Sequence, residues 1–340
     1  MQTIQIDASK SFSLAELPLL SITEPYDILV SVRGVALNPV DTKIFKTASA
    51  GRILGYDASG VVEAVGPQAE ALGFTKGDAV IYAGALGRAG SNAQYQLVDA
   101  RIVGKKPETL SWEDAAALPL VGLTAWEMYE DKFGLKPFTD NSSEVLLVVN
   151  GAGGVGTMAI ALAKAVFGIT KIVATASRPE TIEWVKKFGA TDVLNHRDPL
   201  GPQLEALGVS GKVTLAFITY DTPRYTKELF AHMRYLGQIG SIVETDNDEP
   251  VPVQDMTAFY KSLSFHWEFM AGKPMHGYDL ESQGRILTHL SRLADEGKLG
   301  ESQVTLRKEL SIANLAEMHK LQASGKSYGK IVFTVPETIQ

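Results

Sequence analysis

The segment Glu144–Gly156 constrains the fold of this chain more than any other stretch. It reads EVLLVVNGAGGVG, an apolar and β-branched run followed by clustered glycines, and the helical pattern TMAIALAK comes directly after it at residues 157–164. A strand, a tight turn and a helix in this order form the first half of a dinucleotide-binding βαβ unit. A second apolar run, KIVATA at residues 171–176, follows at the spacing expected for the next parallel strand.

The residues of the turn have separate roles in such a site. Gly151 is expected to permit the tight turn, Gly153 to let the backbone approach a pyrophosphate, and Gly156 to let the helix pack closely on the strand. Gly154 and Val155 complete the motif at the helix start, where free N–H groups and the positive end of the helix dipole bind phosphate. A glycine-rich turn that only connects two elements is the alternative, but the βαβ context favours a cofactor site.

The end of the second strand indicates which nicotinamide cofactor to expect. An NAD site usually has Asp or Glu there, about 20 residues after the glycines, to bind the ribose 2′-hydroxyl. This chain has Ser177 and Arg178 instead, and a guanidinium suits a 2′-phosphate. We therefore expect NADPH. Alternatively, Ser177 only caps the next helix, with Glu180 completing a capping box and Pro179 in the first turn; the two roles are compatible.

Composition excludes several classes of function. The net charge of −7 and the lack of long Lys/Arg runs argue against a nucleic-acid or anionic-membrane surface. The N-terminus does not resemble a signal peptide, and no stretch approaches the roughly 18 apolar residues of a membrane span, so we expect a cytoplasmic protein. Because the chain has no cysteine and its six histidines show no HxH or HExxH spacing, we expect no disulfide and no metal site.

The order of predicted elements indicates an α/β protein with two domains. Residues 1–122 are typical of short strands and turns, whereas 123–272 alternate strand and helix, which implies a parallel sheet with right-handed crossovers. Within the second region we expect a helix from Tyr225 to Leu236. A final strand at 330–335 suggests that 273–340 rejoins the first domain, so that a Rossmann domain is inserted in a β-rich one. The strand at 263–269 is expected at a sheet edge, which favours a homodimer.

Seven motifs carry a family resemblance that spans nearly the whole chain. They are NPVDT at 38–42, GYDASGVV at 55–62, GD at 77–78, AAALP at 115–119, GLT at 122–124, GAGGVG at 151–156 and GKIV at 329–332. In this order they resemble the zinc-free quinone oxidoreductase branch of the medium-chain dehydrogenase/reductase superfamily. The resemblance implies a GroES-like catalytic domain, a Rossmann domain, a cleft between them, and NADPH-dependent reduction of quinones or activated alkenes.

The resemblance also identifies where the zinc-dependent branch binds its catalytic metal with Cys, His and Cys. The matching positions here look like Asn38, Tyr56 and Leu120, so neither that zinc nor the structural zinc of the missing cysteine lobe is expected. Without a Lewis acid, hydrogen bonds must stabilise a developing oxyanion, and Tyr56 and Asn38 would supply the donors. The alternatives are that Tyr56 is a core residue and that Asn38 caps a turn.

Further site residues follow from the resemblance alone. Thr124 is similar to the nicotinamide-facing threonine of the family, unless it caps a helix. His196 falls where relatives have an aromatic side chain near the 2′-phosphate, and Lys326 would add positive charge, although both could be surface groups. Asp41 would lie near the cleft, or would accept hydrogen bonds within a local turn.

These patterns together predict an oxidoreductase that transfers hydride from NADPH to a quinone or to the β-carbon of an α,β-unsaturated carbonyl. Two alternatives remain at this point. One is a carbonyl or alcohol dehydrogenase, which the absent zinc ligands disfavour. The other is an NADPH-binding sensor without turnover.

Overall fold

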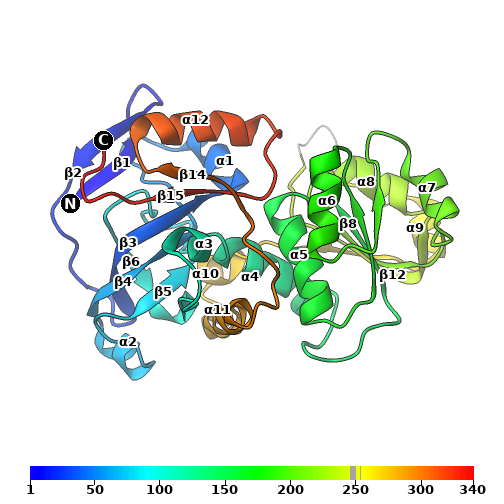
Figure 1. Cartoon of the computed structure of the whole chain (residues 1–340), viewed down its shortest axis with the longest axis horizontal. Helices are drawn as coiled ribbons and strands as arrows, with labels where there is room; N and C mark the ends of the chain where they lie inside the picture. The colour runs from blue at the N-terminus through cyan, green and yellow to red at the C-terminus, as the bar shows by residue number, and fades with distance from the viewer. Residues whose placement is uncertain (246–249, 253) are drawn as a thin grey trace. The chain divides into compact units, whose positions relative to one another are not determined.

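The computed structural model of the chain describes residues 1–245, 250–252 and 254–340, and these residues form two compact units. Unit 1 consists of 1–123, 270–297 and 302–340, and unit 2 consists of 124–269 with the short segment 298–301. The sequence-based expectation set the limits of the inserted domain at 123 and 272. The blue N-terminal and red C-terminal segments in Figure 1 both belong to unit 1, where the backbone N–H of Ile339 donates to Gln2 Oε1 at 2.8 Å.

Unit 1 is built on a largely antiparallel sheet in the strand order β14-β15-β3-β4-β5-β7, with β6 also paired to β3. Its strands are β1 (Gln2–Ile6), β2 (Phe12–Glu16), β3 (Asp27–Leu37), β4 (Ala58–Val65), β5 (Ala79–Tyr82), β6 (Tyr95–Asp99), β7 (Val103–Lys105), β14 (Val304–Glu309) and β15 (Lys330–Thr334). Its helices are α1 (Pro39–Thr47), α2 (Pro67–Ala71), α3 (Trp112–Ala116), α10 (Gly272–His276), α11 (Leu280–Asp295) and α12 (Ile312–Ala323).

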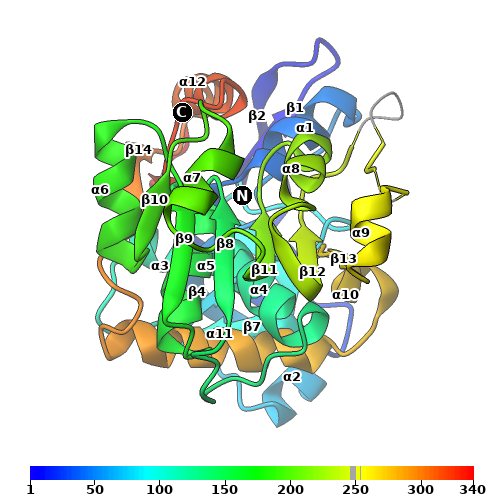
Figure 2. The same ribbon diagram turned by 90° about the vertical axis from the view of Figure 1, so that its right-hand side faces the viewer.

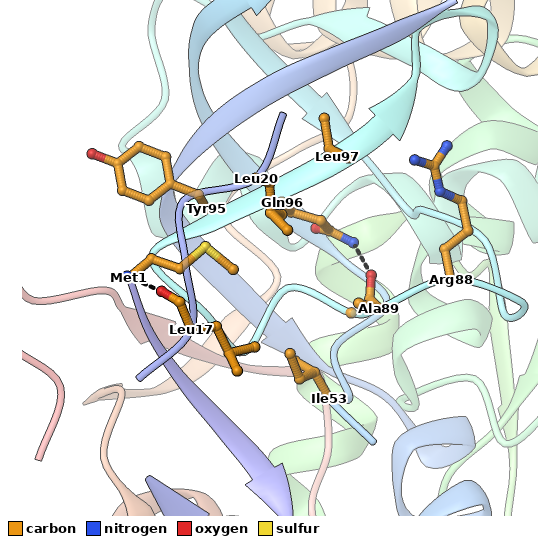
Figure 3. Close-up of a pocket in the computed structure, with 10 residues that line it drawn as sticks. Met1, Leu17, Leu20, Ile53, Arg88, Ala89, Tyr95, Gln96 and Leu97 are labelled. Carbon is orange, nitrogen blue, oxygen red and sulfur yellow. Dashed lines mark hydrogen bonds between the residues drawn. The ribbon is translucent and has the colours of Figure 1, made fainter. Parts of the chain in front are cut away.

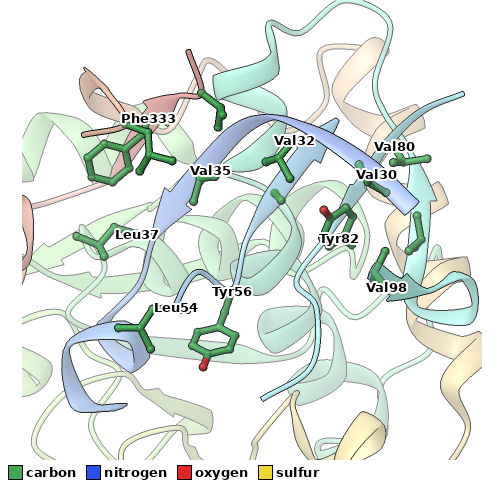
Figure 4. Packing of buried hydrophobic residues seen from close by; sticks show 14 of the residues in the cluster. Val30, Val32, Val35, Leu37, Leu54, Tyr56, Val80, Tyr82, Val98 and Phe333 are labelled. Carbon is green, nitrogen blue, oxygen red and sulfur yellow. The ribbon is translucent and has the colours of Figure 1, made fainter. Parts of the chain in front are cut away.

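The long strand β3 organises this sheet because most of its side chains are buried. Figure 4 shows Val30, Val32 and Val35 from this strand packed among Tyr82 of β5 and Phe333 of β15. β15 pairs antiparallel with β3, Val332 opposite Ala36. The C-terminal strand therefore completes the sheet that the N-terminal part of the chain begins.

Unit 2 contains a six-stranded parallel sheet in the order β10-β9-β8-β11-β12-β13 within the described residues, and Figure 2 shows the strands in this sequence from left to right. The elements are β8 (Val145–Val149), α5 (Gly154–Ala165), β9 (Lys171–Thr175), α6 (Pro179–Phe188), β10 (Asp192–Leu194), α7 (Leu200–Ala206), β11 (Val213–Ile218), α8 (Thr222–Leu229), β12 (Met233–Ser241), α9 (Met256–Tyr260) and β13 (Ser264–Trp267). The strand order reverses between β8 and β11. The predicted doubly wound sheet is confirmed, and ligands bind such sheets beyond the carboxyl ends of the strands at this reversal.

The predicted helix from Tyr225 to Leu236 is wrong in its second half. Helix α8 ends at Leu229, and β12 begins at Met233. The ammonium of Lys261 donates to the carbonyls of residues 230, 231 and 233, at 3.2, 2.6 and 2.9 Å, and so stabilises the chain where it leaves the helix. Met233 is fully buried beside β11, so tertiary packing outweighs the helical pattern of the sequence.

A buried pair of carboxyl groups joins the end of helix α4 (Pro119–Glu127) to the residue after β13. The helix continues into a π-helical segment, Met128–Lys132. Glu127 and Glu268 are 1% and 4% exposed. The pKa of Glu268 is raised to about 8, chiefly by burial and also by the nearby Glu127, while Lys132 opposes the shift from 3.4 Å. The two carboxyl groups are hydrogen-bonded to each other, which requires a proton between them.

Strand β13 lies at the edge of the parallel sheet, as predicted. Large apolar side chains are exposed on and just after it, with Trp267 at 47% and Phe269 at 53%. No helix in the described parts of the chain has the length and apolar character needed to cross a membrane.

Candidate active site

The glycine-rich turn joins β8 to α5 as predicted, but the structural roles of its residues differ from those expected. The left-handed backbone conformation belongs to Asn150, with φ of 59°, and not to Gly151. A Cβ on Gly151 would lie 2.9 Å from the Ala174 Cβ of β9, and one on Gly156 would lie 2.4 Å from the Asn150 carbonyl oxygen. Gly151 is therefore needed for close packing, and the expected role of Gly156 in close helix packing is confirmed.

Gly153 is the N-cap of α5, and Gly154 and Val155 open the first turn of that helix. The side chain of Asn150 lies beside Gly153, where a Cβ would be 2.9 Å from Asn150 Nδ2. The first N–H groups of a helix have no partners within the helix and bind anions. The turn has the close backbone approach and the free helix start that a pyrophosphate requires.

The next helix, α6, begins one residue later than expected. Its N-cap is Arg178, and Pro179 occupies the first turn. The hydroxyl of Thr181 accepts a hydrogen bond from the Arg178 backbone N–H at 3.2 Å and donates to the Arg178 carbonyl at 2.9 Å. The alternative that Ser177 caps this helix with Glu180 is therefore wrong, and Ser177 lies in the preceding loop. Glu180 instead pairs with the Arg178 guanidinium at 3.1 Å.

His196 follows β10 at the same edge of the sheet as Arg178. Burial lowers the pKa of His196, and the positive charges of Arg197, Arg224 and Arg178 lower it further. The Arg224 guanidinium donates to the His196 carbonyl at 3.1 Å. Arg197 and Arg224 were missed by the sequence analysis. Arg224 lies 28 residues after His196, and only the fold brings α8 next to the loop after β10.

The position of Asn38 lies in a buried polar network in unit 1. The Lys330 ammonium donates to Asn38 Oδ1 at 2.6 Å and to Asp57 Oδ2 at 2.9 Å. Asn38 Nδ2 donates to Asp57 Oδ2 at 2.8 Å and to the Ala36 carbonyl at 3.4 Å. The other Asp57 oxygen accepts from the Leu120 N–H at 2.7 Å. The network thus joins two of the three positions that match zinc ligands in the metal-dependent branch.

Asp41 accepts hydrogen bonds within the same region, as the turn-acceptor alternative predicted. Its carboxylate binds the backbone N–H groups of Asn38 and Gly55, at 2.9 and 3.0 Å. Burial raises the pKa of Asp41 to about 7 against these donors. Burial also raises the pKa of Asp57, which Lys330 opposes. Lys330 therefore forms an ion pair with Asp57, and its charge also opposes the raised pKa of Asp41.

Tyr56, the third matching position, is 3% exposed. Its hydroxyl oxygen accepts a hydrogen bond from Arg52 Nη2 at 3.0 Å, and the same guanidinium nitrogen donates to the Leu86 carbonyl. Figure 4 shows the hydroxyl pointing away from the apolar cluster on which the ring packs. Burial raises the pKa of Tyr56 while the charge of Arg52 opposes this. The Tyr56 hydroxyl therefore keeps its proton at neutral pH, and the Arg52 guanidinium fixes its orientation.

Thr124 and Lys326 lie in different units. Thr124 is 4% exposed and sits inside α4, five residues after the helix start at Pro119. The alternative that Thr124 caps a helix is therefore wrong. Lys326 follows α12 in unit 1, and its N–H donates to Ser324 Oγ at 3.3 Å. Their contacts with a cofactor stay predictions.

Two other features bear on the search for a site. No group of three or more His, Cys, Asp or Glu side chains in the described ranges could hold a metal ion. Unit 1 has a pocket of about 280 Å³ whose lining includes Met1, Leu17, Gln96 and Arg88 (Figure 3). None of the predicted site residues lines it, so we do not assign it to the reaction.

Comparisons with known proteins agree with this architecture. An alcohol dehydrogenase GroES-like domain matches residues 24–108, and a zinc-binding dehydrogenase domain matches residues 154–275. A zinc-type alcohol dehydrogenase-like protein of Staphylococcus aureus is 37% identical, with 97% of this chain and 99% of that protein covered. The chloroplastic NADPH-dependent alkenal/one oxidoreductase of Arabidopsis thaliana is 39% identical over 48% of this chain and 43% of its own length.

A solved structure supports the same assignment over the full length. The quinone oxidoreductase from Coxiella burnetii superposes with a TM-score of 0.77 at 25% sequence identity, covering 99% of each chain. The two domain matches cover the β-rich and Rossmann parts of the chain in their expected order. The chain belongs to the medium-chain dehydrogenase/reductase superfamily, in its quinone oxidoreductase-like branch, and is an oxidoreductase of that type.

Proposed function

We propose that this oxidoreductase uses NADPH to reduce a quinone, or the β-carbon of an α,β-unsaturated carbonyl, without zinc. The observation that carries the proposal is the Lys330 ammonium, which lies 2.6 Å from Asn38 Oδ1. A divalent cation bound at Asn38 would be repelled by this buried positive charge. The other two matching positions, Tyr56 and Leu120, offer neither a thiolate nor an imidazole. The zinc in the name of the staphylococcal relative is therefore not carried over to this chain.

Tyr56 is the better of the two proposed oxyanion donors. Its hydroxyl accepts from Arg52, which leaves the O–H proton to be donated to a substrate oxygen. Asn38 directs its amide N–H groups to Asp57 and Ala36, so its role in this proposal is to hold the network. The bound nicotinamide would supply the hydride, and Thr124 is the proposed contact to its ring.

The choice of NADPH rests on the basic residues beyond β9 and β10. Arg178 stands where an NAD site usually has a carboxylate, and His196 adds a polar ring beside three arginines. Ser177 would bind the same phosphate. The name of the Arabidopsis relative includes NADPH dependence, over about half of each chain.

We further propose a homodimer formed through β13. Within the described residues β13 pairs with β12 alone, and an exposed sheet edge favours pairing with another strand. Trp267 and Phe269 would be covered in the dimer.

Steady-state consumption of NADPH with a panel of quinones, enones, aldehydes and alcohols tests the proposal. We expect turnover with quinones or enones that does not change when a chelator is added. Turnover confined to alcohols and aldehydes would support the alcohol dehydrogenase alternative, which the name of the staphylococcal relative favours. Binding of NADPH without consumption by any substrate would support the sensor alternative.

A further inference from the structure

Arg224 reaches from helix α8 to the loop after β10. It is the third residue of α8, and its guanidinium donates to the His196 carbonyl at 3.1 Å. The guanidinium carbon lies 4.9 Å from the centre of the Tyr225 ring, which supports the group from one side. Two contacts therefore orient the Arg224 guanidinium. No sequence pattern connects this residue with the cofactor site.

The charge of Arg224 adds to two others around His196. Arg178, Arg197 and Arg224 each lower the pKa of that imidazole, so the charges of three guanidinium groups act on one partly buried ring. Like charges gathered in this way repel one another, and a bound dianion would remove the repulsion.

Several carboxylates lie on the same segments as these arginines. Glu180 pairs with Arg178 at 3.1 Å, and Asp198 accepts a hydrogen bond from Asn195 Nδ2 at 2.7 Å. Asp221 is the N-cap of α8 and lies close enough to raise the pKa of Tyr225. Glu228 also raises the pKa of Tyr225 and accepts a hydrogen bond from the Leu200 N–H at 2.6 Å. Of these four carboxylates, Glu180 forms an ion pair with an arginine of the cluster. A phosphomonoester forms charge-assisted bonds with arginine forks of the kind that Arg178 and Arg224 provide.

We propose that Arg224, together with Arg178, binds the 2′-phosphate of NADPH, so that residues from two separate segments set the cofactor choice. This inference rests on the proposed use of NADPH. Arg178 comes from the end of β9 and Arg224 from the start of α8. Strand β11, which precedes α8, lies on the other side of β8 from β9. Arg224 nevertheless reaches the loop after β10, on the side of β8 from which Arg178 comes.

Binding of nucleotide fragments tests the role of Arg224 without turnover. Isothermal titration compares 2′,5′-ADP with 5′-AMP, which differ only in the 2′-phosphate. Arg224→Ala should weaken 2′,5′-ADP roughly ten- to a hundredfold and change 5′-AMP less than about twofold. Arg224→Lys, which keeps the charge but not the fork, should lose less than Arg224→Gln.

The controls separate this inference from the proposal on which it rests. Arg234→Ala removes an exposed arginine at the amino end of β12, whereas the cofactor is expected at the carboxyl ends of the strands. This variant should bind both fragments as the wild type does. If the wild type binds 2′,5′-ADP no better than 5′-AMP, both the NADPH assignment and the role of Arg224 are wrong. If the wild type discriminates and Arg178→Ala abolishes this, but the Arg224 variants retain it, only the role of Arg224 is refuted. Equal weakening of both fragments by all three Arg224 variants would also refute it.

Discussion

Replacing Glu268 by glutamine should stabilise the protein at alkaline pH and leave it almost unchanged at acidic pH. In the native state, the buried Glu127–Glu268 pair shares a proton, and burial with the charge of Glu127 raises the pKa of Glu268 from 4.5 to about 8. Glutamine has the shape of the protonated acid and keeps an N–H donor for the Glu127 carboxylate. The variant therefore mimics the form of Glu268 that the fold prefers.

The sign and the size follow from proton linkage. Between pH 4.5 and about 8 the native carboxyl of Glu268 keeps its proton, whereas the unfolded carboxyl has lost it. Raising the pH across this window therefore favours unfolding, by about 1.4 kcal/mol per pH unit. The stabilising contribution is complete below pH 4.5 and lost above about 8. The pKa of Glu268 also depends on the charges of Lys132 and Glu127, so we give the gain in stability as a range. We expect Glu268→Gln to stabilise unit 2 by about 2 to 5 kcal/mol at pH 8.5, which corresponds to roughly 5 to 15 °C in Tm.

Thermal unfolding of the wild type and Glu268→Gln at several pH values between 5 and 9 measures this effect. Glu183→Gln, a change to an exposed carboxylate on α6, is the matched control and should follow the wild type throughout. The difference between Glu268→Gln and the wild type should be small at pH 5 and grow with pH. A constant difference, or a variant less stable than the wild type at pH 8.5, would refute the reasoning.

Three further predictions follow from the polar groups of unit 1 and the edge of unit 2. Tyr56→Phe should slow single-turnover hydride transfer to an enone roughly ten- to a thousandfold without weakening NADPH binding; unchanged rates would make Tyr56 a packing residue. Lys330→Met should destabilise the fold by about 3 to 5 kcal/mol in urea unfolding, because Asp57 loses its buried counter-ion, and adding Asp57→Asn should recover much of the loss; no recovery would contradict a direct Lys330–Asp57 dependence. Trp267→Arg should shift the protein from dimer to monomer in light scattering, and a dimer that survives would exclude β13 as the interface.

The sequence patterns predict the parallel sheet of unit 2 well because each strand and helix there has its own periodic signal. The run before the glycines, Val145–Val149, is apolar throughout, and the run after α5 is apolar from Ile172 to Ala174, as is typical of strands buried on both faces. The failure at residues 230–236 has a physical cause outside local sequence. Lys261, distant along the chain, binds the carbonyls that follow α8, and Met233 is buried beside β11.

The candidate site residues that lie within one short motif could be predicted from the sequence. Those that come together only because distant segments meet in the fold could not. The glycine turn and Arg178 can be found from spacing alone. Arg224 requires the strand order, and Lys330 requires β15 to pair with β3, since Lys330 binds Asn38 across 292 residues of sequence. A lysine at the start of a C-terminal strand has no local feature that indicates burial. Its 3% exposure follows from the fold, in which β15 lies between β14 and β3.

The buried network explains how Asn38 and Asp57 can be buried at an acceptable energetic cost. An asparagine and an aspartate buried at 1% exposure each would be unfavourable without partners. The Lys330 ammonium binds both of them, and Asp57 also binds the Leu120 N–H at the start of α4. The same aspartate therefore compensates a charge and caps the helix that continues to Thr124. A substitution at Asp57 should consequently act on the orientation of α4 as well as on Lys330, which separates it from a substitution of Tyr56, whose hydroxyl binds Arg52 instead.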